Sequence, residues 1–237
     1  MSRRVLVTGG TRGIGAALVE GLLARGDRVV ATGRTLASLA DAASRWPTVK
    51  WRPLDLAQPV AWPAWLEGLG NERLDVVILN AGIQVLRDFT EPGDGEIDIE
   101  EELRVNLAAP MAMARALPAV LAPGATVVFV TSGLALAPKR SSPVYCASKA
   151  GLRSFTKSLR AQWAPLGWQV TEALPPLVDT DMTRGRGTRK MSAEAAARQL
   201  LNGIDAGRDE IDIGATRLLR AILRLSPTLG ERIMRDR

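Results

Sequence analysis

The chain has 237 residues, 46% of them hydrophobic and 24% charged, a composition typical of a folded globular protein rather than a disordered chain. It has no histidine and one cysteine, so the commonest general base and an internal disulfide are both excluded. The formal net charge is +6, but the basic residues are scattered along the sequence, so we expect no nucleic-acid-binding face.

No apolar stretch approaches the roughly 20 residues that a membrane-spanning helix needs, so we also expect no membrane span. The first residues lead directly into a strand pattern and do not show the features of a signal peptide. Together with the single cysteine, this predicts a cytoplasmic protein.

Apolar, β-branched runs alternate with helix-length segments along the chain. Strands are predicted at residues 4–8, 28–32, 49–54, 74–79, 126–131, 168–174 and 210–213. Helices are predicted at residues 14–24, 36–45, 63–69, 97–121, 144–163 and 193–203. The alternation predicts one α/β domain over residues 1–237. Its expected architecture is a Rossmann fold, with a doubly wound parallel sheet of about seven strands and helices on both faces.

A glycine-rich loop joins the first predicted strand to the first predicted helix. It contains Gly9, Thr11, Arg12, Gly13, Ile14 and Gly15. Glycines let the backbone turn sharply and approach a pyrophosphate, and the helix N-terminus offers oriented N–H groups. The position between a strand and a helix favours a dinucleotide site over a purely structural turn.

The second predicted strand indicates which dinucleotide would bind. NAD sites usually place a carboxylate near the end of this strand to bind a ribose hydroxyl, whereas this chain has Gly33-Arg34 and no carboxylate there. The planar guanidinium of Arg34 suits a 2′-phosphate, and Arg12 offers a second one. The pattern predicts NADP(H); the alternative is that Arg34 is an ordinary surface residue.

Tyr145 is the only tyrosine in the chain, and Lys149 follows it by four residues, so on a helix the two side chains share one face. A free phenol has a pKa of about 10, and a neighbouring ammonium favours the phenolate and lowers that pKa. Without histidine, this pair is the strongest candidate for proton transfer. The adjacent Cys146 points to another side of the helix, and we expect a buried structural thiol there.

Polar residues follow several predicted strands. Asp55, Asn80 and Ser132 each stand where a strand ends, and the carboxyl ends of parallel strands meet at one edge of a sheet. Asn106 interrupts a predicted helix, although asparagine is a mediocre helix former. Each residue has an ordinary local explanation, but together they favour an active site at this edge.

Three segments interrupt the regular pattern. Residues 90–102 are strongly acidic, which suits the start of a helix better than a metal site, and we expect no bound metal. Residues 179–191 predict a mobile loop, within a substrate segment at about 179–203, that either closes over an anionic ligand or is simply solvated. Its basic residues are Arg184, Arg186, Arg189 and Lys190. The amphipathic tail, residues 216–235, is interrupted at Pro227; we expect packing or a subunit contact rather than membrane binding.

Taken together, these motifs resemble the short-chain dehydrogenase/reductase family over essentially the whole chain. Within the family they are similar to the branch that includes the DltE-like oxidoreductases. The stretches that carry this likeness are Asn80-Ala81-Gly82-Ile83-Gln84, Thr131-Ser132-Gly133-Leu134-Ala135, Pro143-Val144-Tyr145-Cys146-Ala147 and Leu174-Pro175-Pro176-Leu177-Val178-Asp179-Thr180. One departure is Pro175-Pro176, where the family usually has Pro-Gly, so the turn lacks glycine's conformational freedom.

The resemblance implies roles for the catalytic candidates. Tyr145 would exchange the substrate proton, Lys149 would lower the tyrosine pKa and bind the nicotinamide ribose, and Ser132 would hold the substrate oxygen. Asn106 would anchor a water molecule that relays protons to Lys149.

The resemblance also implies which residues surround the cofactor. The predicted set outside the glycine loop and Arg34 is Asp55 and Leu56 beside the adenine, Asn80, Ala81 and Gly82 near the adenine-side ribose, Pro175, Val178 and Thr180 at the nicotinamide carboxamide, and Tyr145 and Lys149.

The expected function is that of an NADP(H)-dependent oxidoreductase that interconverts a small-molecule carbonyl and an alcohol. The alternative is a non-catalytic, NADP-binding redox-sensing or interaction protein of the same fold. The family also implies a homodimer or homotetramer. The substrate and the physiological direction are left open by the sequence.

Overall fold

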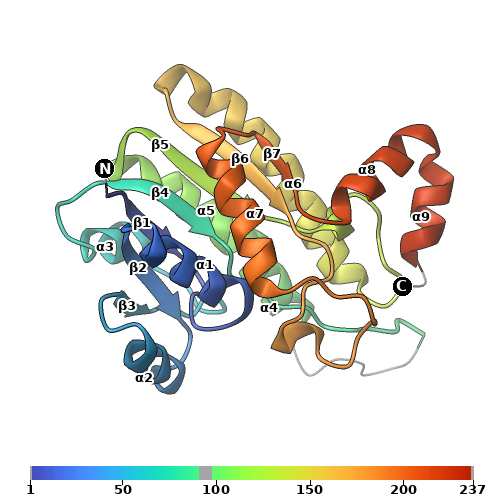
Figure 1. Ribbon diagram of the computed structural model, residues 1–237, viewed down its shortest axis with the longest axis horizontal. Helices are drawn as coiled ribbons and strands as arrows, with labels where there is room; N and C mark the ends of the chain where they lie inside the picture. Colours follow the sequence, from blue (N-terminus) through green and yellow to red (C-terminus); the bar gives the residue numbers. More distant parts are fainter. Residues whose placement is uncertain (1, 91–97, 236–237) are drawn as a thin grey trace.

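The computed structural model describes residues 2–90 and 98–235. Their centre is a seven-stranded sheet in the order β3-β2-β1-β4-β5-β6-β7, in which every neighbouring pair is parallel (Figure 1). The strands are β1 (Arg4–Val7), β2 (Arg28–Gly33), β3 (Lys50–Pro53), β4 (Leu74–Leu79), β5 (Leu121–Val130), β6 (Gln169–Leu174) and β7 (Glu210–Asp212). The predicted doubly wound Rossmann fold is confirmed.

Helices cover both faces of the sheet. One apolar cluster joins the sheet to α1 (Gly13–Ala24) and α7 (Ala193–Asp205), and the other joins it to α3 (Trp62–Glu67), α5 (Ala109–Ala116) and α6 (Pro143–Trp163). Helix α2 (Leu36–Arg45) follows β2, and α4 (Ile99–Leu103) precedes α5. Because both faces are covered, the inner strands are largely apolar; Val5, Leu6 and Val7 of β1 are all fully buried.

The predicted helix at 97–121 differs most from the structure. Its first residue, Ile97, lies outside the described residues. Helix α4 then passes into a π-helical turn, Arg104–Ala108, before α5 begins, and a short 3-10 turn, Leu117–Ala119, ends the segment. The last predicted helical residue, Leu121, already belongs to β5 and pairs with Leu74. Such π-turns are typical of functional sites, and this one contains Asn106.

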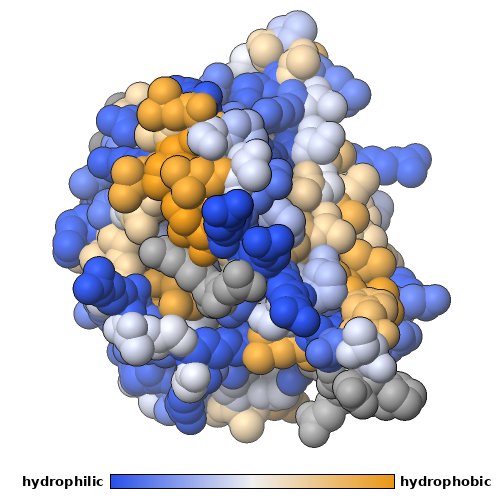
Figure 2. Space-filling view, turned by 90° about the vertical axis from the view of Figure 1, so that its right-hand side faces the viewer, coloured by the Kyte–Doolittle hydropathy of each residue, from blue (hydrophilic) through white to orange (hydrophobic). Residues whose placement is uncertain are grey.

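The C-terminal tail forms two helices that pack on their own chain. Helix α8 (Thr216–Leu225) ends where the sequence predicts an interruption, and α9 (Pro227–Arg235) follows. Leu219 is buried in α8, and the Arg140 N–H donates to the Arg235 carbonyl at 3.0 Å. The same pair of helices leaves Leu218, Leu225 and Leu229 exposed, and Figure 2, which faces this side, shows apolar residues gathered among hydrophilic ones. Within 2–90 and 98–235, no helix is long and apolar enough to cross a membrane.

A buried network of charges ties α6 to the far edge of the sheet. The fully buried Glu172 of β6 accepts the Thr131 hydroxyl at 2.7 Å and forms an ion pair with Arg153 of α6. Arg153 also contacts Glu210 of β7 at 3.3 Å, and Arg220 of α8 binds the same carboxylate at 2.7 Å. Burial raises the pKa of Glu172, and Arg153 offsets part of that effect.

We expect Arg153→Met to destabilise the protein by about 3–5 kcal/mol, because it leaves the buried carboxylate of Glu172 without its closest cation. Urea unfolding of the variant measures this, and the double variant Arg153→Met/Glu172→Met should regain most of the loss. The matched control is Arg28→Met, which removes an exposed pair with Glu72 and should cost about 0–1 kcal/mol. Equal losses from the two single variants would contradict the prediction.

Candidate active site

The candidate residues gather at the carboxyl edge of the sheet, where the amino-terminal part of α6 meets the ends of β4 and β5 (Figure 1). Ser132 follows β5 and caps a short 3-10 turn, and its Oγ accepts the Leu134 N–H at 3.1 Å. The side chain of Ser132 also hydrogen-bonds the hydroxyl of Tyr145 on α6. Both residues are 9% exposed, so this hydrogen bond sits at a nearly closed surface.

Lys149 is buried one helical turn below Tyr145. Its Nζ lies 5.7 Å from the centre of the Tyr145 ring and donates to the Val130 carbonyl at 3.0 Å. In the part of the chain that the structure describes, no carboxylate forms an ion pair with it. Burial therefore lowers the pKa of Lys149 to about 8, since the charged form has lost its hydration.

The pKa of Tyr145 shifts in the opposite direction from the one that the sequence predicts. Burial raises it to about 12, and the hydrogen bond from Ser132 only partly offsets that effect. The phenol is therefore protonated at neutral pH, which suits a proton donor.

Asn106 links the loop after β4 to α6. Its Oδ1 accepts the Ile83 N–H at 2.9 Å, and its Nδ2 donates to the Ile83 carbonyl at 2.8 Å and to Ser148 Oγ at 3.3 Å. Ser148 Oγ in turn donates to the Tyr145 carbonyl at 2.8 Å. The Asn106 side chain is thus fully occupied by protein groups, so it positions this loop against the helix that carries Tyr145 and Lys149.

Gly82 lies where these groups come closest. A Cβ added there would lie 3.0 Å from Asn106 Oδ1 and 3.4 Å from Lys149 Nζ. The first distance is tighter than usual, whereas the second is about that of ordinary van der Waals contact, so a side chain at this position would require Asn106 to shift slightly.

The glycine loop has the geometry that a pyrophosphate needs. Gly9 and Gly13 have φ angles of +68° and +54°, which favour glycine. A Cβ at Gly15 would lie 1.9 Å from the Gly9 carbonyl oxygen, so the start of α1 presses directly on the loop. Ile14 packs on the core beneath it. The loop can therefore bring backbone N–H groups close to a phosphate at the N-terminus of α1.

Asn80 holds this loop in place. Its Nδ2 donates to the carbonyls of Thr8 and Gly9 at 3.1 and 3.3 Å, and Thr8 Oγ1 accepts the N–H groups of Asn80 and Ala81 at 3.0 and 3.1 Å. The family resemblance places Asn80 near the adenine-side ribose, but in the structure its side chain mainly joins the ends of β1 and β4 by hydrogen bonds.

Arg12 and Arg34 belong to two adjacent segments, the glycine loop and the end of β2. A Cβ at Gly33 would lie 2.6 Å from Thr11 Cγ2, so the glycine loop touches the end of β2 directly. Both arginines are exposed, and neither has an ion-pair partner among residues 2–90 and 98–235. With no carboxylate at the end of β2, the residues present fit a dinucleotide that carries a 2′-phosphate.

The remaining predicted cofactor residues lie along the same edge. Leu56 and Ala81 line one small cavity between β4 and α5. Asp55 is less free than expected, because its Oδ1 accepts the Ala57 N–H at 3.0 Å. On the opposite side, the Pro175 carbonyl accepts the Gly133 N–H at 2.9 Å, and Val178 pairs with Met191.

Thr180 closes the far side of the glycine loop. A Cβ at Gly13 would lie 3.0 Å from Thr180 Cγ2, so the turn at 175–180 reaches the loop at the start of α1. The residues assigned to the pyrophosphate and to the nicotinamide end thus meet across one edge.

The structure also contains contacts that the sequence patterns did not reveal. Arg186 Nη1 donates to Gln84 Oε1 at 2.9 Å, and Gln84 Nε2 donates to Ser142 Oγ at 3.0 Å. The buried Glu102 pairs with Arg87 at 3.3 Å, although the sequence treats it as one of many acidic helix-start residues. The partners of each contact are far apart in the sequence, so sequence patterns do not indicate that they meet. The one sequence feature that pointed toward the first contact was the basic character of the 179–191 segment.

Cys146 is a buried thiol, as predicted. It is 5% exposed, its Sγ accepts the Lys139 N–H at 3.3 Å, and burial raises its pKa. The thiol therefore stays protonated and is a poor nucleophile. Among the described residues, no cluster of three or more His, Cys, Asp or Glu could hold a metal ion.

We expect Lys149→Met to stabilise the cofactor-free protein by about 1–3 kcal/mol at neutral pH, because it removes a buried charge. The folded-state pKa of about 8 lies below the ordinary value of 10.5, so the unfolded chain binds more protons between these pH values. Wild-type stability therefore rises relative to the variant as the pH increases from about 8 to 10.5. Urea unfolding of both proteins at several pH values checks this; a pH-independent difference would contradict it.

The sequence was compared with known proteins. A family model for short chain dehydrogenase matches residues 3–191. The uncharacterized oxidoreductase DltE of Bacillus subtilis (strain 168) is 37% identical over 218 residues, which cover 87% of this chain and 86% of that protein. L-xylulose reductase of Homo sapiens is 33% identical over 209 residues, which cover 87% of this chain and 82% of that enzyme.

Solved structures agree with these relationships. A short chain dehydrogenase from Burkholderia cenocepacia J2315 in complex with NADP has a TM-score of 0.88 and 28% identity, with 98% of this chain and 97% of that chain covered. A short chain dehydrogenase/reductase from Burkholderia phymatum in complex with NAD has a TM-score of 0.80 and 19% identity, with 94% and 95% covered. Proteins of this fold thus bind nicotinamide dinucleotides of either kind.

Proposed function

Because the chain belongs to the short-chain dehydrogenase/reductase family, and so to a family of oxidoreductases, we propose that it reduces a small-molecule carbonyl to an alcohol with NADPH. The observation that carries this proposal is the arrangement of Ser132, Tyr145 and Lys149. A protonated phenol, a hydroxyl hydrogen-bonded to it and a buried ammonium lie together at the sheet edge that the glycine loop also borders. These groups are what proton transfer to a carbonyl oxygen requires.

Each side chain has a defined task in this reaction. NADPH, when bound beside the glycine loop, would supply the hydride for the carbonyl carbon. The Ser132 hydroxyl holds the carbonyl oxygen, and Tyr145 gives its phenolic proton to that oxygen as the C–O double bond becomes a single bond. The Lys149 ammonium stabilises the phenolate that remains, until a proton from solvent restores the phenol.

The pKa values fit Tyr145 as the proton donor of this proposal. A Tyr145 pKa of about 12 keeps the donor protonated at neutral pH, and a Lys149 pKa of about 8 keeps most of the ammonium charged. Asn106 acts by positioning, since its side chain joins Ile83 to Ser148. A role for it in holding a relay water stays a prediction from the family resemblance.

We expect Tyr145→Phe to lower kcat by about 100- to 10,000-fold, the usual range for a lost general acid, while NADPH still binds. Phenylalanine keeps the buried ring, so the loss should come from the hydroxyl alone. Steady-state rates on a broad carbonyl panel that includes L-xylulose and D-erythrulose measure the first effect, and quenching of tryptophan fluorescence measures the second. Full turnover in the variant would refute the proposed role of Tyr145. A wild type that binds NADPH without reducing any compound would instead favour the sensing alternative.

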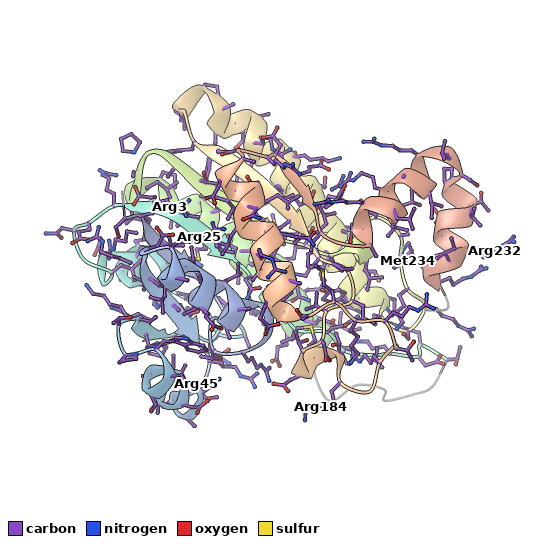
Figure 3. All side chains as sticks on the ribbon, in the orientation of Figure 1. Arg3, Arg25, Arg45, Arg184, Arg232 and Met234 are labelled. Atoms are coloured by element: carbon purple, nitrogen blue, oxygen red, sulfur yellow. The ribbon has the colours of Figure 1, made fainter. Side chains whose placement is uncertain are left out.

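Arg34 and Arg12 support NADP over NAD in this proposal. We expect Arg34→Ala to weaken NADPH binding by about 10- to 100-fold, the effect of losing a charge-assisted hydrogen bond, and to leave NADH binding nearly unchanged. Titration of both cofactors into both proteins checks this. Arg45→Ala is the control, because this exposed arginine, labelled in Figure 3, is the last residue of α2 and pairs with Asp41 of the same helix. Equal losses for the two cofactors would contradict the assignment.

The homodimer or homotetramer implied by the family stays a prediction that light scattering can check.

A further inference from the structure

A turn between β6 and α7 fixes the backbone around Arg186. Gly185 and Gly187, on either side, have φ angles of +74° and +60°, and the Arg186 N–H donates to the Thr183 carbonyl at 3.0 Å. The segment is closed at its base, where the Asp179 N–H donates to the Met191 carbonyl at 2.8 Å. Arg186 is therefore presented from an ordered turn rather than from an open loop.

The side chain of Arg186 folds back toward the catalytic groups. Its Nη1 donates to Gln84 Oε1 at 2.9 Å, and Gln84 Nε2 donates to Ser142 Oγ at 3.0 Å. Ser142 is the N-cap of α6, three residues before Tyr145. The charge of Arg186 acts to lower the pKa of Tyr145, so the guanidinium lies within electrostatic range of the phenol. The guanidinium thus lies near the amino-terminal end of α6, which carries Tyr145.

Among the described residues, two of the other three cations of this segment pair with carboxylates, and the third, Arg189, is exposed, whereas Arg186 is half-buried and has no carboxylate partner. Arg184 forms an ion pair with Asp181, and Lys190 lies 3.2 Å from Asp179. Figure 3 shows Arg184 at the outer edge of the molecule, directed away from the body. For Arg186, the recorded side-chain partner is the neutral amide of Gln84, and no carboxylate among the described residues pairs with it.

This arrangement suits the recognition of an anion. A guanidinium has five N–H donors in a planar fork, and the bond to Gln84 occupies one of them. The amide orients the fork without cancelling its charge. A half-buried cation without a counter-ion is unfavourable by itself, and an oxyanion of a ligand would both neutralise it and accept two parallel hydrogen bonds.

We propose that Arg186, oriented by Gln84, binds an oxyanion of the substrate, so that the site takes carbonyl compounds bearing a carboxylate or a phosphate. This inference rests on the proposed carbonyl chemistry at Tyr145 and specifies its substrate class. It also distinguishes this chain from a relative such as L-xylulose reductase, whose name denotes a neutral sugar.

Two series of matched probes test the proposal. The first series pairs oxo acids of increasing length, from pyruvate through acetoacetate and levulinate to longer homologues, with their methyl esters. The second pairs dihydroxyacetone phosphate with dihydroxyacetone. Binding to the protein saturated with NADP is measured by calorimetry, and kcat/KM with NADPH is measured in parallel.

At least one anionic probe should bind about 10-fold or more tightly than its neutral partner, the effect expected of a charge-assisted hydrogen bond. In the binding measurements, Arg186→Gln should abolish this preference without changing the affinity for the neutral partner, and Arg186→Lys should keep part of the preference. Arg184→Gln is the control. It also removes a cation from this segment, but that cation is exposed and already paired with Asp181, so the anion preference should remain. The oxo-acid and phosphate series show which oxyanion the site prefers.

The inference is overturned if neither series shows an anion preference, or if Arg186→Gln weakens anionic and neutral partners equally. Because binding is measured without turnover, the two proposals fail separately. Anion preference without NADPH oxidation would leave the Arg186 site standing and refute carbonyl reduction. Turnover of neutral carbonyls without anion preference would do the reverse.

Discussion

The ammonium of Lys149 is buried, and much of the geometry of the candidate site follows from the need to accommodate this buried charge. A charge with one carbonyl partner, the 3.0 Å bond to Val130, depends on close and well-directed neighbours. A Cβ at Gly82 would lie 3.4 Å from Nζ and 3.0 Å from Asn106 Oδ1, so the loop after β4 passes close to both groups at a glycine. The π-turn that contains Asn106 then ties this loop to α6. Burial thus opposes stability locally, while it keeps the ammonium at the distance from Tyr145 where a phenolate would need it.

A second buried charge, that of Glu172, connects the candidate site to the rest of the fold. Thr131, immediately before Ser132, donates to the buried Glu172, and Glu172 is paired with Arg153 on the helix that carries Tyr145. Helix α8 lies behind the next residue of this loop, because a Cβ at Gly133 would come 3.1 Å from Thr216 Oγ1. Helix α8 therefore packs against the loop that follows Ser132, so the tail contributes to the candidate site's surroundings.

The sequence predicts features that depend on local periodicity or spacing. The inner strands could be predicted because they are runs of mostly apolar residues. The shared helical face of Tyr145 and Lys149 could be predicted because four residues separate them. The early start of β5 was not, because Pro123 and Gly124 look like a turn, and Gly124 indeed has a φ of +74°. The direction of the Tyr145 pKa shift was also wrong in prediction, since it depends on burial, which is a property of the folded chain.

Contacts between distant segments mark where prediction from sequence ended. Gln84 and Arg186 are 102 residues apart, and nothing in either segment indicates that their side chains meet at 2.9 Å. The pattern did show that the 179–191 segment is basic, and it left two readings open. The cations of this segment differ in their partners: Arg184 has its own carboxylate, whereas Arg186 donates to the neutral amide of Gln84. The proposed oxyanion site rests on this difference, because a half-buried guanidinium without a carboxylate partner among the described residues retains its charge for a ligand.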